Sequence, residues 1–199
     1  MSARKLTIVG LGGSLARVSK SRAALRVALA GAENAGAATE LLDLRELDLP
    51  MYNPDADEPG EAATRVIESC YAADGLIWSS PLYQGSISGS FKNALDWLHL
   101  PSGSVYLTDK VIGLISVAGG TQGLQAVNTM EFCVRALRAW AVPLVVPVSR
   151  GQLQDEGVDR QLRMLGSEVV RIAEHFVTER EPEHEKVCAE AADRLAVAA

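Results

Sequence analysis

Cysteine, histidine and aromatic residues are scarce in this sequence, and each shortage argues against a class of protein. Its 199 residues include three cysteines, three histidines and 5% aromatic side chains. Cys70, Cys133 and Cys188 are odd in number, lie far apart and form no C-x-x-C pair, so neither a disulfide framework nor a metal site is expected. With few histidines and no Gly-x-Ser-x-Gly sequence, a serine hydrolase is not expected either. Reduced cysteines indicate a cytoplasmic protein.

The sequence also lacks clustered positive charge and long apolar runs. Its formal net charge is −6, and lysine and arginine form no run, which argues against a nucleic-acid partner or an anionic membrane surface. No apolar stretch approaches the ~20 residues that span a bilayer. Small molecules and other proteins remain as the expected partners.

What the sequence does contain is an alternation of short apolar runs and helical periodicity, within a chain that is 48% apolar and 22% charged. Strands are expected at residues 6–10, 39–43, 75–79, 111–117 and 144–148. Helices are expected at residues 20–35, 60–72, 88–99, 122–140 and 155–177. This alternation predicts an α/β fold with a doubly wound, five-stranded parallel sheet between two layers of helices. One domain is expected over residues 1–180, followed by an alanine-rich arm or short helix over 181–199.

The first loop lies in "VGLGGSLARVSKSRAAL", residues 9–25. A strand, glycines and then a helix often bind phosphate, because the first amides of a helix lack partners and its dipole favours an anion. The sequence has no Walker motif, and a dinucleotide fingerprint fails at Leu15, where it requires glycine. Ser14, Ser19 and Ser21 are instead expected to surround a terminal monophosphate. The alternative is that Ser19 or Ser21 only caps the helix.

Two further loops follow expected strands, at the carboxyl edge of the sheet where open α/β folds bind ligands. In "SSPLYQGSISGSFKNALDWL", residues 79–98, Pro81 restricts the loop, Tyr83 offers a flat surface and Ser88 is a plausible helix cap. In "SVAGGTQGLQA", residues 116–126, two adjacent glycines leave backbone amides open to close approach. Together these loops suit a flat heteroaromatic ring.

The three loops, in this order, closely resemble the NADPH-dependent FMN reductase family over residues 5 to about 150. The resemblance implies a flavodoxin-like three-layer fold with strand order 2-1-3-4-5, and FMN and NADPH or NADH as cofactors. Many members have Gly-Ser-x-Arg in the first loop, whereas here Ala16 stands fourth and the arginine is Arg17. The cofactor-binding residues that the resemblance implies are Ser14, Arg17, Ser19, Ser21, Pro81, Leu82, Tyr83, Gln84, Gly85, Ser86, Ala118, Gly119, Gly120, Thr121 and Gln122.

The implied activity is an FMN-dependent NAD(P)H oxidoreductase, which passes a hydride from NAD(P)H to flavin N5 and then reduces a second acceptor. That acceptor is free flavin, a quinone or an azo compound. No catalytic side chain is expected, because the cofactor carries the chemistry. The alternative is a flavodoxin-like electron carrier or an FMN-binding regulatory module without NAD(P)H turnover.

The resemblance also suggests a homodimer or homotetramer, with Phe91, Trp97 or the helix around residues 124–134 in the interface. Phe91, Leu95 and Leu98 have the spacing of a core stripe. Lys92 and Asp96 are expected to pair on an exposed helical face. Asp43, at the end of the second strand, is expected to have a surface or capping role.

Overall fold

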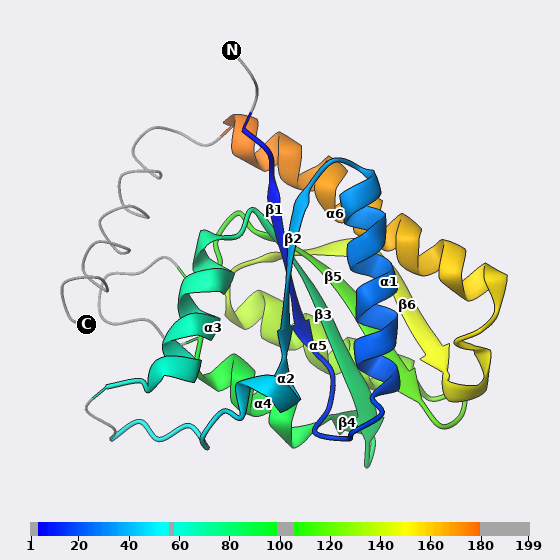
Figure 1. Cartoon of the computed structure of the whole chain (residues 1–199), viewed down its shortest axis with the longest axis horizontal. Coiled ribbons are helices and arrows are strands. Elements are labelled where there is room, and N and C mark those ends of the chain that lie inside the picture. The colour runs from blue at the N-terminus through cyan, green and yellow to red at the C-terminus, as the bar shows by residue number, and fades with distance from the viewer. Residues whose placement is uncertain (1–3, 56–57, 99–105, 180–199) are drawn as a thin grey trace.

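The computed structural model describes residues 4–55, 58–98 and 106–179; the arm expected at 181–199 lies outside these residues, as does Cys188. Its sheet has five parallel strands in the order β2-β1-β3-β5-β6, plus a two-residue strand, β4, antiparallel to β3 (Figure 1). The sequence did not predict β4. Without it, β5 and β6 are the fourth and fifth strands, so the order matches the expected 2-1-3-4-5. The strands are β1 (Thr7–Gly12), β2 (Ala38–Asp43), β3 (Gly75–Tyr83), β4 (Ser86–Ile87), β5 (Val111–Ala118) and β6 (Trp140–Ser149).

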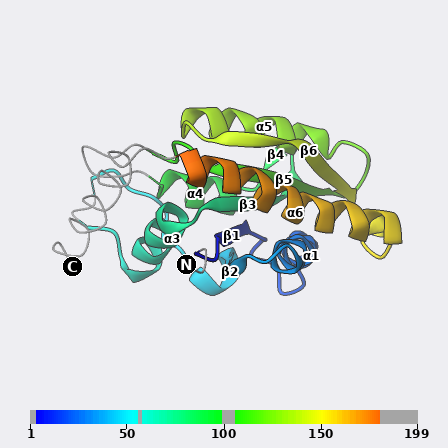
Figure 2. The same ribbon diagram turned by 90° about the horizontal axis from the view of Figure 1, so that it is seen from above.

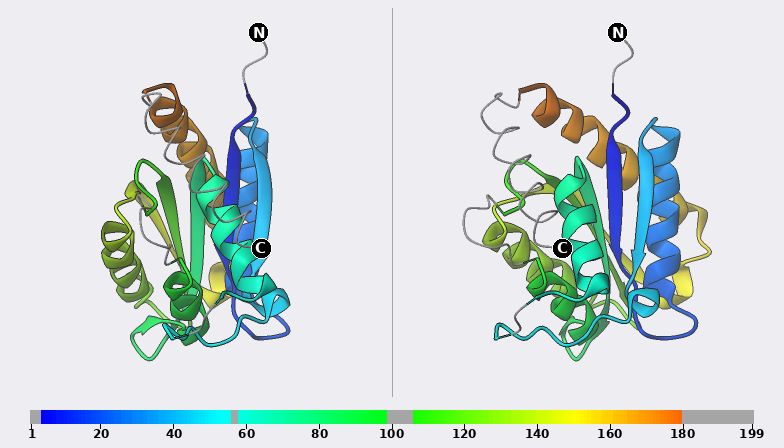
Figure 3. Two further views of the ribbon diagram at one scale, coloured as in Figure 1. Left: turned by 90° about the vertical axis from the view of Figure 1, so that its left-hand side faces the viewer. Right: turned by 60° about the vertical axis from the view of Figure 1, so that its left-hand side comes forward.

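Helices cover both faces of the sheet, as the apolar runs predicted. They are α1 (Lys20–Asn34), α2 (Leu44–Leu47), α3 (Glu61–Ala72), α4 (Gly89–Asp96), α5 (Leu124–Ala136) and α6 (Glu156–Glu179), with a short 3-10 helix at Arg150–Gln152. Figures 2 and 3 show α1 and α5 on opposite sides of the sheet. Along β3, Ile77 packs with α1 and α6, whereas Leu76 and Trp78 pack in the second core cluster with α3, α4 and α5. A strand buried on both faces needs an unbroken apolar run, which explains its composition.

The end of α5 differs from expectation by four residues. The helix stops at Ala136 instead of continuing to residue 140, and Trp140 begins β6. Arg138 adopts a left-handed conformation, with φ of 60°, while the amides of Arg138 and Ala139 close back on the carbonyls of Arg135 and Val134. This C-terminal motif normally carries glycine at the left-handed position, and with Arg138 there no residue marks the end of the helix.

Several smaller expectations are settled by the packing. The core stripe is confirmed, since Phe91, Leu95 and Leu98 are all buried. Trp97 is also buried, and its indole N–H donates to the Pro50 carbonyl at 2.9 Å. Phe91 and Trp97 therefore belong to the core of the chain itself, which leaves the helix around residues 124–134 as the expected interface.

Two polar expectations have a clear outcome as well. Lys92 and Asp96 form the expected ion pair on α4. Asp43 caps α2, because its Oδ1 accepts from the amide of Arg45 at 3.1 Å, so the capping role is confirmed. The surface role is wrong, since Asp43 is only 2% exposed.

Candidate cofactor-binding site

Three loops meet at one edge of the sheet because they follow the carboxyl ends of three parallel strands. They comprise residues 13–19 after β1, residues 83–86 between β3 and β4, and residues 119–123 after β5. The central strand β3 pairs with both β1 and β5, and this places the first and third loops on either side of it (Figure 1). Every residue predicted for the site lies in these loops or in the elements that flank them.

The first loop leaves the sheet at a point where only glycine fits. A Cβ on Gly12 would lie 2.1 Å from the carbonyl oxygen of Ser79 on the neighbouring strand. Gly13 has φ of 98° and donates its amide to the same carbonyl at 3.0 Å. The glycines thus let the chain turn sharply against β3 and begin a loop whose backbone is fixed at its base.

The three predicted serines come together at the start of α1. Ser14 Oγ donates to Ser19 Oγ at 3.1 Å, and the Oγ atoms of Ser19 and Ser21 lie 3.0 Å apart. All three side chains are buried. Ser19 is also the N-cap, since its Oγ accepts from the amide of Arg22 at 3.2 Å. A capping role for Ser19 is therefore compatible with a role in anion binding.

This cluster has the chemistry of a phosphate site. Three hydroxyl donors lie at the N-terminus of a 15-residue helix whose first turn contains no acidic residue. The helix dipole favours a negative charge at this end, and hydroxyls are effective donors to phosphate oxygens. Arg17 is exposed and lies in the same loop.

The second loop continues β3 past the sheet and returns as β4. Pro81 is buried, Leu82 is half-buried and Tyr83 is 48% exposed. Gln84 and Gly85 both have positive φ, of 49° and 82°. The turn therefore projects Tyr83, Gln84 and Gly85 into solvent beyond the sheet edge.

Polar side chains below the second loop hold it to α4. Ser80 Oγ donates to the Pro81 carbonyl at 2.9 Å and accepts from the Ser88 amide at 3.0 Å. Ser88 in turn caps α4 by accepting from the Phe91 amide at 3.3 Å, as the sequence predicted. The loop is thus anchored on both sides of its exposed tip.

The third loop is open on its outer side. Gly119, Gly120, Thr121 and Gln122 are all exposed, and a Cβ on either glycine would meet no atom within 4 Å. Below the loop, Ser116 Oγ donates to the Gly123 carbonyl at 2.7 Å. From β6, Ser149 Oγ donates to the Gly120 carbonyl at 3.1 Å.

The second loop and the start of β4 lie against α5, the helix that follows the third loop. Ser86 Oγ lies 3.5 Å from Thr129 Oγ1, and a Cβ on Gly85 would lie 3.5 Å from the amide oxygen of Gln125. Sequence reasoning placed neither Thr129 nor Gln125 near the site, because contacts between segments far apart in the sequence leave no local pattern.

The loops supply few groups that could act as an acid or a base. Across residues 12–21, 81–86 and 118–122, the titratable side chains are Arg17, Lys20 and Tyr83, with no carboxylate or histidine. Such a site can bind and orient a ligand through hydroxyls, amides and a cationic flank. It is poorly equipped for general acid–base catalysis by side chains.

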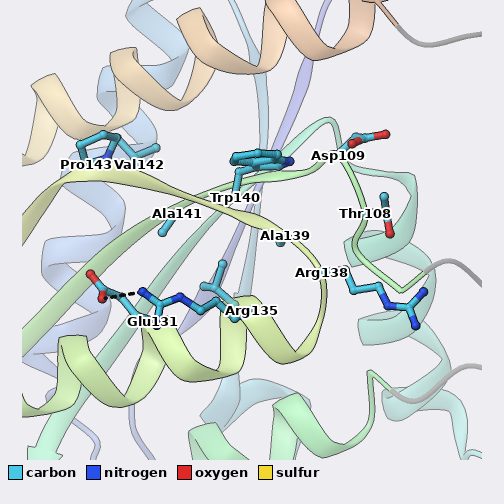
Figure 4. A pocket seen from close by; sticks show the side chains of 11 residues that line it. Thr108, Asp109, Glu131, Arg135, Arg138, Ala139, Trp140, Ala141, Val142 and Pro143 are labelled. Carbon is cyan, nitrogen blue, oxygen red and sulfur yellow. Dashed lines mark ion pairs between the residues drawn. The ribbon is translucent and has the colours of Figure 1, made fainter.

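A separate cavity of about 640 Å³ lies away from the three loops, where α5 ends and β6 begins (Figure 4). Trp140, Arg135 and Arg138 form part of its wall. Both arginines have partners: Arg135 lies 4.0 Å from Glu131, and Arg138 lies 5.2 Å from the ring centre of Tyr106. Because β5 and β6 begin here, this cavity is at the amino edge of the sheet, opposite the predicted site.

Comparison with known proteins gives a family and a fold. The family model described as NADPH-dependent FMN reductase matches residues 6–153. An "NADPH azoreductase" from Bacillus sp. (strain OY1-2) is 32% identical over 134 residues, which cover 66% of this chain and 73% of that protein. An "FMN-dependent NADPH-azoreductase" from Staphylococcus aureus is 37% identical over 100 residues, which cover 50% of this chain and 51% of the relative. The chain thus spans only about half the length of the second relative.

A solved structure shares the fold at low sequence identity. The "flavoenzyme NAD(P)H:(acceptor) oxidoreductase" from Paracoccus denitrificans aligns with a TM-score of 0.71 and 24% identity, covering 85% of this chain and 98% of that one. A flavodoxin from the domain Archaea aligns with a TM-score of 0.62 and 10% identity, and it covers 85% of this chain and 100% of that one. The flavodoxin-like architecture predicted from the sequence is confirmed.

Proposed function

Because the chain belongs to the NADPH-dependent FMN reductase family, a family of oxidoreductases, we propose that it oxidises NADPH or NADH with FMN and reduces a small-molecule acceptor. The observation that carries this proposal is the meeting of three hydroxyls, from Ser14, Ser19 and Ser21, at the N-terminus of α1. A nearby pair of open loops borders the same sheet edge. The serine cluster would thus bind the phosphate of FMN, and the two open loops would border its ring.

The residues at the site fit FMN in their chemistry. Ser14, Ser19 and Ser21 would donate to its phosphate, with Arg17 on the exposed side of the loop. Residues 81–86 and 118–122 would border the ring, where the bare backbone at Gly119 and Gly120 can approach closely. We propose these as the cofactor-binding residues.

When bound, FMN supplies the ring that accepts a hydride from the nicotinamide. The work of the chain is then to hold the phosphate, fix the ring plane and keep one side open for a second flat molecule. The scarcity of acid–base groups in the loops agrees with this division of labour. The half-exposed Tyr83 and the open third loop line the side on which nicotinamide or acceptor would stack.

The relatives suggest a class of acceptor, because two of them are named as azoreductases. We therefore propose an azo compound, a quinone or free flavin as the acceptor of this chain. None of the helices in the described part of the chain has the length and hydropathy needed to span a bilayer. The cytoplasmic location stays a prediction.

Steady-state turnover tests the proposal. The purified full chain is mixed with FMN and with NADPH or NADH, and nicotinamide oxidation is followed with an azo dye, a quinone and free flavin in turn. We expect continuous oxidation that requires FMN and accelerates with at least one acceptor. A stably bound yellow flavin that NADPH and NADH both leave oxidised would contradict the proposal and favour an electron carrier or regulatory module.

The proposed enzyme is expected to be a homodimer or homotetramer, with α5 in the interface. Two large apolar side chains on this helix are exposed: Phe132 by 69% and Leu124 by 51%. Exposed apolar side chains on one helix are typical of a protein–protein contact. The third loop leads directly into α5, so an interface there would lie beside the site.

A further inference from the structure

Two arginines outside the first loop donate to its backbone carbonyls. Arg45, in the short helix α2, donates from Nη1 to the Leu15 carbonyl at 2.5 Å. Arg22, in α1, donates from Nη2 to the Arg17 carbonyl at a longer 3.4 Å. The loop is therefore held from the side by elements that follow β1 and β2.

Both arginines contact one buried carboxylate, Arg22 through its guanidinium and Arg45 through its backbone amide. Asp43 Oδ2 lies 2.6 Å from Arg22 Nη1, and Asp43 Oδ1 accepts from the Arg45 amide at 3.1 Å. The Asp43 side chain is fully shielded from solvent, whereas that of Arg22 is 24% exposed. The hydrogen bond and the negative charge of Asp43 raise the pKa of Arg22, so this guanidinium stays charged.

The same carboxylate lies against the start of the loop. A Cβ on Gly13 would be 3.3 Å from Asp43 Oδ1 and 3.5 Å from Cβ of Arg22. Asp43 thus lies close to the first turn of the loop and is linked to the middle of the loop through Arg22 and the start of α2.

The carbonyl contacts fix the direction of the loop amides. In a trans peptide the C=O and N–H groups point in opposite directions. Because the Leu15 carbonyl points to Arg45, the amide of Ala16 points away from it, and the Arg17 carbonyl orients the amide of Val18 in the same manner. Amides directed away from the arginines are free to serve as donors to an anion.

From this geometry we propose that Asp43 is a positioning residue for cofactor phosphate, acting through Arg22 and Arg45 to hold residues 13–19 in the phosphate-binding conformation. The proposal rests on the proposed function, in which these residues bind FMN. Asp43 itself does not touch the phosphate. It organises the hydroxyls and amides that do.

Charge alone predicts the opposite effect of Asp43. A carboxylate close to a phosphate repels it, so removing that negative charge should strengthen FMN binding. If Asp43 instead positions the loop, removing the charge frees Arg22 and should weaken FMN binding. The direction of the change in FMN affinity therefore distinguishes charge repulsion from loop positioning by Asp43.

The decisive variant is Asp43→Asn, which keeps the shape of the side chain and can still cap α2. FMN and riboflavin are titrated into this variant and the wild type, and thermal unfolding is recorded for both proteins. We expect FMN to bind about tenfold more weakly, the effect of losing roughly one hydrogen bond to a charged group. Riboflavin, which lacks the phosphate, should bind within about twofold of its wild-type affinity. Unchanged or tighter FMN binding would overturn the proposal.

A second variant keeps the test decisive if Asp43→Asn fails to fold. Arg45→Met removes the donor to the Leu15 carbonyl, and Arg65→Met is the matched control, since Arg65 pairs with Glu40 at 3.0 Å on an exposed surface. We expect Arg45→Met to weaken FMN binding about three- to tenfold, and this loss should persist in 1 M salt, where charges are screened beyond ~3 Å. Equal FMN affinities for the two methionine variants would overturn the proposal.

The wild type distinguishes this proposal from the proposed function. If it binds FMN and riboflavin equally, the phosphate site itself is wrong and the positioning role falls with it. If it prefers FMN but neither Asp43→Asn nor Arg45→Met lowers that preference, only the positioning role is wrong.

Discussion

Ser79, on the central strand, donates a hydrogen bond of 2.9 Å from its Oγ to the carbonyl oxygen of Ser21, in the first turn of α1. The Ser79 carbonyl in turn accepts from the amide of Gly13 at 3.0 Å. One fully buried residue of β3 therefore holds the start of the first loop and the first turn of the helix that follows it.

Replacing Ser79 with alanine should loosen this attachment. Ser79→Ala removes one buried hydrogen bond, so we expect the free energy of unfolding to fall by about 1 kcal/mol. FMN should bind several-fold more weakly as well, because Ser21 shifts. Urea unfolding and a flavin titration check the two effects, and unchanged values in both would show that the contact is dispensable.

Gly120→Ala should separate ring binding from folding. A Cβ at this position meets no atom within 4 Å, so the free energy of unfolding should change by less than about 0.5 kcal/mol. If the third loop borders the flavin ring, the added methyl group obstructs it, and FMN and riboflavin should both bind more weakly by similar factors. Paired titrations of the two flavins give the answer. Loss of FMN binding alone would place the phosphate, and not the ring, at this loop.

The general plan of the fold could be predicted from the sequence because each parallel strand carries its own apolar run. Two helix ends show how a glycine after the last turn helps such a prediction. Gly36 follows α1 with φ of 99°, and the predicted end of that helix was correct within one residue. Arg138 takes the same role after α5, where no glycine marks the stop, and the predicted helix ran four residues too far.

The meeting of the three loops was predictable for a related reason, whereas their role in cofactor binding stays a prediction. Loops that follow parallel strands must gather at one edge, so the order of Ser14, Tyr83 and Gly119 along the chain was enough to place them together. The support around them was not predictable. Arg45 and Leu15 are 30 residues apart, and their contact depends on how α2 packs, which no periodicity encodes.

Cys70 should give stability a pH dependence above neutrality. Burial raises the pKa of its thiol to about 12, whereas the ordinary value is 9.0. Between these values the unfolded chain loses the proton and the folded chain keeps it, so stability is complete below pH 9 and falls as the pH rises. We expect the stability advantage of wild type over Cys70→Ala to shrink by about 1 to 2 kcal/mol between pH 8.5 and 10.5. Urea unfolding at several pH values tests this; an advantage independent of pH would contradict it.

Phe132→Asp should dissociate the expected oligomer. In the oligomer the aspartate would be buried against a partner at the α5 surface, and burying an unpaired charge is costly. A surface position that no partner covers does not bear this cost. Met164→Asp is the matched control, since Met164 is 48% exposed on α6, in the other helical layer. Light scattering should show an oligomer for wild type and the control, and a 21.2 kDa monomer for Phe132→Asp. A monomeric wild type at micromolar concentration would contradict the prediction.

Titration of Ser14→Ala with FMN and with riboflavin is the sharpest test of the proposed phosphate site. A hydrogen bond to a charged group contributes ~1.5 to 3 kcal/mol, so FMN binding should weaken by roughly 10- to 150-fold. Riboflavin binding should barely change, because riboflavin carries no phosphate. A loss confined to FMN is the result that a phosphate site at Ser14, Ser19 and Ser21 predicts. Equal affinity of the wild type for FMN and riboflavin, or an equal loss of both in the variant, would contradict it.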